Sequence, residues 1–147
     1  MSDLRCAVVG VGYLGRFHAQ KYQQIEGVKL VGVCDASAER AKTVADELKV
    51  EAYSDYKQLV GKVDAVTVAS TTRTHYEVTK FFLENGVHVN VEKPMTVTIE
   101  EAEELVSLSK KKNLKLQVGH VERFNVALQA AKEKLNTPLF IECHRLA

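Results

Sequence analysis

The sequence predicts an α/β fold in which a doubly wound parallel sheet is covered by helices on both faces. Short apolar runs alternate along the chain with segments of helical periodicity, and this alternation is typical of parallel sheets. Runs such as KLVGVCD and VDAVTVAS are apolar at most positions, as in strands buried on both faces. The 147 residues, 46% of them hydrophobic, suffice for one compact domain with a substantial core.

The expected elements follow one another through short connections. Strands are predicted at 4–10, 29–35, 51–53, 63–70, 87–91 and 114–120, and helices at 13–25, 38–48, 74–84, 98–112 and 123–135, with one helical turn at 55–60. Ser37 can cap the helix that follows it. Thr74 with Glu77 has the spacing of a capping box. Thr98 with Glu101 repeats that spacing at the start of a later helix.

The charge balance argues against nucleic acid or an anionic membrane surface as a partner. The chain has 20 basic and 19 acidic residues and a net charge of +1. The apolar run AVVGVG near the N-terminus is too short and too rich in glycine for a signal peptide or a membrane span. The expected compartment is therefore the cytoplasm.

The cysteines and most histidines are expected to have structural roles. The cysteines form no CxxC pair and fall within predicted strands, where they are interpreted as small buried apolar side chains: Cys6, Cys34 and Cys143. Three histidines are interpreted as structural or surface residues: His18, His88 and His144. No group of histidine, cysteine and carboxylate has the spacing of metal ligands, so no metal site is predicted.

A glycine-rich loop follows the first strand and opens the first helix. Its sequence, GVGYLG, has the GxGxxG spacing of dinucleotide-binding, or Rossmann, folds. The first glycine allows a tight turn, the second lets a pyrophosphate approach the backbone, and the third lets the helix pack closely on the sheet. A glycine-rich turn without a ligand is the alternative. The predicted cofactor contacts in this loop are Gly10, Gly12, Tyr13, Leu14 and Gly15.

Asp35 ends the second strand, 20 positions after Gly15, where dinucleotide-binding folds carry an acidic residue. A carboxylate there accepts hydrogen bonds from a ribose 2′-hydroxyl and repels a 2′-phosphate, so NAD is favoured over NADP as the cofactor. Arg40, one helical turn further on, could partly compensate that repulsion. Asp35 could instead only cap the next helix, a role for which Ser37 is better placed.

Polar residues also follow the predicted strand at 63–70, in the segment ASTTRTH. Ligands of doubly wound sheets bind outside the carboxyl ends of the strands. Ser70, Thr71 and His75 are therefore predicted to face the cofactor if this strand lies beside the first. A capped loop with a solvated histidine is the alternative interpretation.

The stretch VHVNVEKPMT places Lys93 directly after a strand of alternating valines. A lysine at this position is either an exposed surface residue or a participant in chemistry. Near bound NAD⁺ and partly desolvated, its amine would have a lowered pKa and could accept a proton.

Taken together, GVGYLG, VCD, ASTTRTHYE, VEKPMT and GHVERFN resemble, in order and spacing, the N-terminal domain of the Gfo/Idh/MocA family of sugar oxidoreductases. The resemblance covers the whole chain, and EKP is its most specific motif. It implies that Lys93 contacts both the nicotinamide and the reacting sugar hydroxyl and is the catalytic residue. It also implies that Glu92 and Pro94 frame this lysine beside the cofactor.

The segment GHVERFN resembles the branch of the family that acts on nucleotide sugars, the UDP-N-acetylglucosamine 3-dehydrogenase-like proteins. This resemblance makes His120, Arg123 and Asn125 candidate substrate-binding residues together with Lys93. A cation at the carboxyl end of a strand can meet a phosphate or a sugar. The branch usually continues with proline where this chain has Val126, which leaves the helix start open. Arg123 could alternatively form only a helix-end salt bridge.

The resemblance also implies a second domain. Members of the family continue into a large antiparallel sheet that completes the substrate pocket and usually makes the contact between subunits of a homo-oligomer. The expected organisation is a Rossmann domain at 1–120, followed by a linker helix and the first strand, FIECHRLA, of a truncated α+β domain at 121–147.

The expected function is NAD-dependent oxidation of a secondary hydroxyl of a sugar, with the fragment itself binding only the cofactor. A non-catalytic NAD-binding redox sensor is the alternative. A methyltransferase or flavoprotein is disfavoured by EKP.

Overall fold

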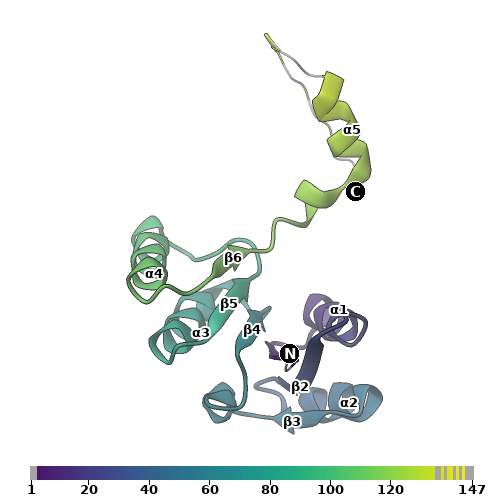
Figure 1. Cartoon of the computed structure of the whole chain (residues 1–147), viewed down its shortest axis with the longest axis vertical. Coiled ribbons are helices and arrows are strands. Elements are labelled where there is room, and N and C mark those ends of the chain that lie inside the picture. Colours follow the sequence, from purple (N-terminus) through teal and green to yellow (C-terminus); the bar gives the residue numbers. More distant parts are fainter. Residues whose placement is uncertain (1–2, 135–136, 138, 141, 143, 145–147) are drawn as a thin grey trace.

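The fold is built on a six-stranded parallel sheet with the strand order β3-β2-β1-β4-β5-β6 (Figure 1). The computed structural model describes residues 3–134, 137, 139–140, 142 and 144. The strands are β1 (Leu4–Val9), β2 (Val28–Cys34), β3 (Glu51–Tyr53), β4 (Ala65–Val68), β5 (His88–Val91) and β6 (Leu116–Val118). This order confirms the predicted doubly wound sheet.

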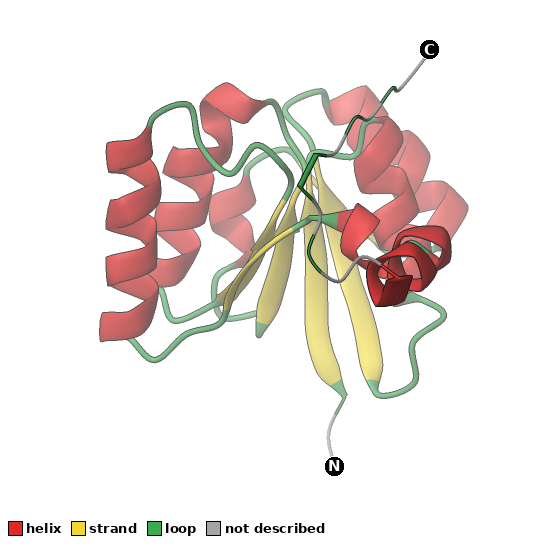
Figure 2. Ribbon diagram, turned by 90° about the horizontal axis from the view of Figure 1, so that it is seen from above, coloured by secondary structure: helices red, strands yellow, loops and turns green. Residues whose placement is uncertain are grey.

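Helices cover the sheet on both sides (Figure 2). The helices are α1 (Tyr13–Tyr22), α2 (Ala38–Leu48), α3 (Thr72–Glu84), α4 (Ile99–Lys111) and α5 (Val126–Lys134), with 3₁₀ turns η1 (Tyr56–Leu59) and η2 (Val121–Phe124). Helices α1 and α2 contact each other, as do α3 and α4. Each pair lies on one side of the sheet in Figure 1. Helices α1 to α4 therefore form two layers with the sheet between them, whereas α5 lies beyond β6 and contacts η2.

Two apolar cores result from the alternation of side chains along the strands. Val8 and Val33 belong to the core under α1 and α2, whereas Val9 and Val66 belong to the core under α3 and α4. Because neighbouring residues of a strand point to opposite faces, nearly continuous apolar sequences supply both cores at once. This explains why the strands are apolar at successive positions.

The carboxyl ends of the two central strands create the place where a ligand can bind. β1 pairs with both β2 and β4, so the chain winds outward in opposite directions from the middle of the sheet. In such sheets the crevice outside the strand ends at this reversal is the ligand site. The condition set for Ser70 and Thr71, that their strand lies beside the first, is therefore met.

The helix starts confirm two predicted caps and correct a third. Ser37 accepts a hydrogen bond from the Arg40 backbone N–H, and Thr98 with Glu101 forms a complete capping box. The box predicted at Thr74 is wrong, because α3 begins two residues earlier with Thr71 as its N-cap. Thr74 lies inside the first turn instead, and its hydroxyl donates to the Thr71 carbonyl.

Two other helix boundaries also differ from the prediction. Helix α1 ends at Tyr22, so residues 23–25 form turns rather than a last helical turn. The helix predicted from Arg123 is divided into η2 and α5, with Asn125 between them. The strand predicted at 140–147 falls largely outside the described residues. Cys143 lies there too, whereas the predicted burial of Cys6 and Cys34 is confirmed.

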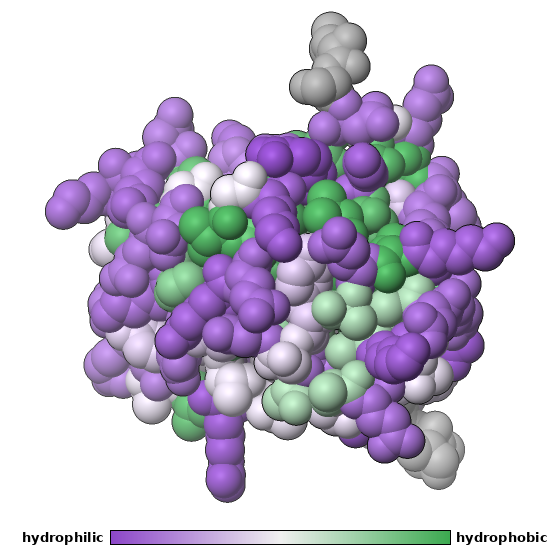
Figure 3. Space-filling model, turned by 90° about the horizontal axis from the view of Figure 1, so that it is seen from below, coloured by the Kyte–Doolittle hydropathy of each residue, from purple (hydrophilic) through white to green (hydrophobic). Residues whose placement is uncertain are grey.

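The molecular surface is predominantly hydrophilic on the face seen in Figure 3, with smaller apolar patches between the charged side chains. Within the described part of the chain, no helix is both long enough and apolar enough to cross a membrane.

Candidate functional site

The glycine loop between β1 and α1 is held by very close backbone packing. Gly10 has a φ of +85°, and a Cβ there would lie 2.4 Å from the Ser70 backbone nitrogen. A Cβ on Gly15 would lie 1.8 Å from the Gly10 carbonyl oxygen. Gly12, by contrast, faces open space, with nothing within 4 Å of its added Cβ. Gly10 and Gly15 therefore shape the loop, while Gly12 leaves room for a ligand.

The N-terminus of α1 is suited to bind an anion at this opening. Gly12 is the N-cap, and no side chain caps the first turn. The free N–H groups of a helix N-terminus bind phosphate through hydrogen bonds and the helix dipole. Tyr13 and Leu14, also predicted as cofactor contacts, are exposed in this first turn. A dinucleotide diphosphate thus fits against Gly12 without displacing a protein group.

Asp35 is buried at the end of β2 and held by the backbone on both sides. One carboxylate oxygen accepts the Val11 N–H and the other accepts the Ser37 N–H, each at 2.9 Å. The Arg40 guanidinium lies 3.3 Å from one oxygen and 3.4 Å from the other. Charged hydrogen bonds of this kind fix the orientation of a carboxylate. Asp35 therefore joins the glycine loop to the start of α2.

A cavity of about 500 Å³ brings five of the predicted cofactor residues together. It lies at the carboxyl ends of β1, β2 and β4. The predicted residues in its wall are Gly10, Gly12, Asp35, Ser70 and Thr71. Arg40 and Tyr56 line it as well, from the helical segments that follow β2 and β3. The sequence points to Arg40 through its position one helical turn after Asp35, but no motif indicates Tyr56.

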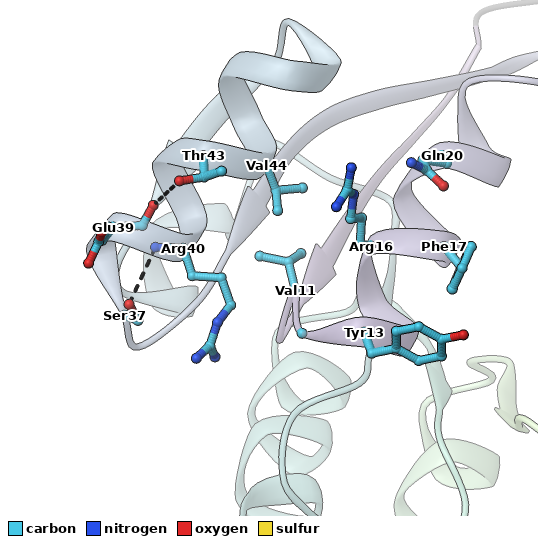
Figure 4. Close-up of a pocket in the computed structure, with 11 residues that line it drawn as sticks. Val11, Tyr13, Arg16, Phe17, Gln20, Ser37, Glu39, Arg40, Thr43 and Val44 are labelled. Atoms are coloured by element: carbon cyan, nitrogen blue, oxygen red, sulfur yellow. Dashed lines mark hydrogen bonds between the residues drawn. The ribbon is translucent and has the colours of Figure 1, made fainter.

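A second cavity, of about 670 Å³, lies beside the first, between α1 and α2 (Figure 4). It shares Gly12 and Arg40 with the first cavity. Arg16, on its α1 side, forms an ion pair with Glu47 at 2.8 Å. Arg40 thus stands between the two cavities, next to the carboxylate of Asp35.

His75 does not line either cavity but is buried between two loops, with 1% of its surface exposed. Its Nε2 lies 3.0 Å from the Ser70 carbonyl oxygen, and its Nδ1 lies 2.9 Å from the Pro94 carbonyl oxygen. The expected contact between this imidazole and the cofactor stays a prediction. His75 ties the loop after β4 to the loop after β5.

Lys93 lies at the end of β5, where its side chain is exposed at the wall of a third cavity, of about 1040 Å³. Glu92 beside it is buried, and the peptide bond between Lys93 and Pro94 is cis. The wall contains residues from α1, from the ends of β5 and β6, and from η2 and α5: Leu14, Glu92, Lys93, Gly119, His120, Arg123 and Lys132. Because Leu14 belongs to the glycine loop, the lysine cavity adjoins the proposed cofactor path.

The three remaining candidates lie beyond β6 and differ in their surroundings. His120 and Arg123 line the lysine cavity with exposed side chains. Asn125 caps α5, since its side-chain oxygen accepts the Ala127 N–H at 3.0 Å and the Leu128 N–H at 3.4 Å. Val126 consequently occupies the first helical position, where proline is favoured because it lacks an N–H. Valine at this position is thus compatible with the same helix start.

The fold and the site define a class of protein. A parallel sheet of this order, a glycine loop open at an uncapped helix N-terminus, and an acidic residue at the end of β2 form a dinucleotide-binding Rossmann domain. The chain belongs to the Gfo/Idh/MocA family of oxidoreductases, because the family described as an oxidoreductase family with an NAD-binding Rossmann fold matches residues 4–120. The cofactor of this family is NAD.

Relatives and solved structures agree with this assignment. The chain is 41% identical, over its whole length, to UDP-N-acetylglucosamine 3-dehydrogenase of Acidithiobacillus ferrooxidans, of which it covers 47%. It is 37% identical over 91% of its length to scyllo-inositol 2-dehydrogenase (NAD(+)) of Bacillus subtilis, of which it covers 40%. The chain therefore spans less than half of these relatives.

Solved structures superpose closely on the fold. The Acidithiobacillus ferrooxidans enzyme GnnA matches with a TM-score of 0.85 at 42% identity, covering 91% of this chain and 44% of that one. Scyllo-inositol dehydrogenase of Lactobacillus casei, solved with NAD(H) and scyllo-inositol, also has a TM-score of 0.85, at 29% identity. Its match covers 91% of this chain and 41% of that structure.

Proposed function

We propose that this chain forms the cofactor-binding half of an NAD-dependent dehydrogenase that oxidises a secondary hydroxyl of a sugar, in particular a nucleotide sugar. The observation that carries the proposal is the position of Lys93. It stands in the wall of a cavity of about 1040 Å³ together with Leu14 of the glycine loop. A lysine in this position can reach a substrate hydroxyl beside a nicotinamide bound along that loop.

Lys93 is proposed to receive the proton that leaves the substrate hydroxyl. Bound NAD supplies the acceptor for the hydride that leaves the same carbon. The amine of Lys93 orients the hydroxyl through a hydrogen bond and then takes its proton, which general base catalysis requires. Glu92 and Pro94 fix the backbone on either side of this lysine.

A nucleotide sugar is the favoured substrate class because two basic side chains stand, beside one carboxylate, Glu122, on the far wall of the lysine cavity. Arg123 and Lys132 project from η2 and α5, and His120 precedes them. Guanidinium and ammonium groups bind phosphate oxygens with charge-assisted hydrogen bonds. The relationship to UDP-N-acetylglucosamine 3-dehydrogenase supports the same class. Asn125 remains a proposed substrate contact through the segment it anchors.

The proposal includes the organisation of the whole protein. Residues 1–120 form the Rossmann domain, and residues 121–147 lead into a second domain that completes the substrate pocket and makes the homo-oligomer contact. The length of the relatives, about twice that of this chain, supports a second domain. We further propose that the protein works in the cytoplasm and has no nucleic acid partner, in line with its net charge of +1.

The test is an assay of the full-length protein against a panel of nucleotide sugars and free sugars with NAD⁺, followed by the absorbance of NADH. Lys93→Met is expected to lower kcat by about a hundredfold or more, the range for loss of a general base. Lys110→Met, an exposed lysine at the end of α4, serves as the control and is expected to keep full activity.

Two results would reject the proposal. If Lys93→Met kept both its turnover and its pH profile, the lysine would not be the base. If the full-length protein bound NADH but oxidised no sugar, the redox-sensor alternative would replace the dehydrogenase.

A further inference from the structure

His18 and Glu92 form a pair that links helix α1 to the loop after β5 that carries Lys93, the lysine loop (residues 92–94). His18 lies on α1, the helix that the glycine loop opens, and Glu92 directly precedes Lys93. The Nε2 atom of His18 is 2.8 Å from one carboxylate oxygen of Glu92. The two residues are 74 positions apart in the sequence, so only the folded sheet brings them together.

The carboxylate of Glu92 is buried and uses both of its oxygens. Only 5% of the residue is exposed, and its second oxygen accepts the Lys93 backbone N–H at 3.2 Å. A buried carboxylate is tolerated where hydrogen bonds or a cation satisfy it. Glu92 is therefore a bridge between a histidine of α1 and the backbone of the proposed catalytic lysine.

Gly119, after β6, closes the space on the other side of this carboxylate. A Cβ at Gly119 would lie 2.9 Å from the same Glu92 oxygen that contacts His18. The Gly119 N–H also donates to the carbonyl of Val91, which anchors it to β5 at 2.8 Å. The glycine thus lets Glu92 reach His18 without moving the strands.

The far end of the lysine loop is held by a second histidine. His75 of α3 contacts the Pro94 carbonyl at 2.9 Å, one residue beyond Lys93. The tripeptide Glu92-Lys93-Pro94 is therefore held between two histidines from two helices. His75 contacts the backbone carbonyl of Pro94. His18 contacts the side-chain carboxylate of Glu92, which in turn accepts the Lys93 N–H.

We propose that His18 is a positioning residue for Lys93, acting through Glu92, and that it couples occupation of the α1 N-terminus by the cofactor to the position of the lysine loop. The consequence for catalysis rests on the proposed function of Lys93. The coupling has a direct physical basis, because His18 and the N–H groups that bind phosphate belong to the same rigid helix.

The test measures amide hydrogen exchange of Lys93 by NMR in the 147-residue chain, with and without NADH. His18→Leu removes the bond to Glu92, whereas His18→Gln can place an amide N–H near the position of the imidazole Nε2. Exchange at Lys93 is expected to be about fivefold faster in His18→Leu, the factor for one hydrogen bond, and close to wild type in His18→Gln. NADH is expected to slow this exchange in the wild type and in His18→Gln but not in His18→Leu.

Lys21→Leu on the same helix is the matched control, since the Lys21 side chain is exposed and, among the described residues, hydrogen-bonds only to Gln24. It should leave the Lys93 exchange unchanged. Gly119→Ala disturbs Glu92 from the opposite side and should accelerate the exchange as His18→Leu does, which keeps the test decisive if His18→Leu does not fold.

The proposal is overturned if His18→Leu leaves Lys93 exchange unchanged, if His18→Gln behaves like His18→Leu, or if Gly119→Ala has no effect. These results concern the link alone. The catalytic role of Lys93 is tested separately by Lys93→Met in the full-length protein, so either idea can fail without the other.

Discussion

The cofactor end of the sheet and the segment beyond β6 contrast in how completely they are packed. Around the glycine loop, Gly15 has no room for a single methyl group, and Asp35 is 7% exposed. Beyond β6, Val121, Phe124 and Val126 are 65%, 70% and 78% exposed. The surroundings of the glycine loop are fully packed by contacts within the domain, whereas the segment beyond β6 exposes apolar side chains on the surface.

This difference indicates how the two regions obtain their shape. The cofactor site is fixed by backbone contacts and buried polar groups within the domain, so it should form and bind NAD in the isolated chain. The lysine cavity is lined on one side by α1 and the ends of β5 and β6, and on the other by exposed, charged residues of η2 and α5. Substitutions around the glycine loop should therefore change stability or cofactor affinity, whereas substitutions in the segment beyond β6 should change substrate affinity alone.

The largest effect is expected from Gly15→Ala. Its Cβ would overlap the Gly10 carbonyl oxygen, so the loop or α1 must move, at a cost of roughly 2 kcal/mol or more in the free energy of unfolding. Urea denaturation measures this cost. Gly12→Ala is the matched control, because its Cβ meets no protein atom, and it should lose no more than about 1 kcal/mol, the cost of alanine at an N-cap.

Gly12→Ala should nevertheless weaken NADH binding by about tenfold or more, since the new methyl group stands where a diphosphate approaches the backbone. Calorimetric titration measures the affinity. Equal losses of stability in the two glycine variants would contradict the conclusion that Gly15 shapes the loop whereas Gly12 leaves room for the cofactor.

Asp35→Asn is expected to weaken NADH binding by about tenfold, because it removes the charge that strengthens hydrogen bonds to a ribose hydroxyl. Calorimetric titration again gives the affinity. Asp46→Asn, an exposed aspartate of α2, is the control and should bind NADH normally. An unchanged affinity in Asp35→Asn would remove this carboxylate from the cofactor site.

A smaller effect is expected from alkaline pH. Burial raises the pKa of Cys6 to about 11 and that of Cys34 to about 12, above the ordinary thiol value of 9.0. The unfolded chain therefore releases these protons first, so the contribution of the two thiols to stability should be constant below pH 9 and fall as the pH rises from 9 toward 11 and beyond. Urea denaturation across this range measures the fall, which should be shallower in Cys6→Ala/Cys34→Ala. An equally steep fall would assign it to other groups.

The smallest effect on the domain is expected at the exposed segment. Arg123→Ala and Lys132→Ala should change the free energy of unfolding by less than about 0.5 kcal/mol and leave NADH affinity intact. In the full-length protein both should raise the KM for a nucleotide sugar. A loss of stability in the 147-residue chain would show that this segment is packed rather than open.

The sequence predicts a local feature of the fold well where that feature depends only on residues of the same segment. The strands follow from their apolar runs, and the cap of α4 follows from Thr98 and Glu101. The sequence predicts the start of α3 two residues late, because Thr71, Thr72 and Thr74 are all possible caps and only the turn out of β4 selects among them.

The parts of the site that the sequence does not predict depend on distant residues. The sequence indicates only a structural or surface role for His18, because its partner Glu92 is 74 positions away and is reached only through the order of the strands. The sequence predicts His75 at the cofactor but does not reveal that its imidazole is buried between two loops, beside the carbonyl groups of Ser70 and Pro94. Lys132 carries no motif, and its place in the lysine cavity follows from the path of α5.

The most direct measurement is calorimetric titration of the 147-residue chain with NADH, and with S-adenosylmethionine and FAD as comparisons. The account predicts saturable binding of one NADH per chain, weakened in Gly12→Ala while the fold persists, and no binding of the other two cofactors. Absence of NADH binding by the folded wild-type chain, or preferential binding of S-adenosylmethionine or FAD, would contradict it.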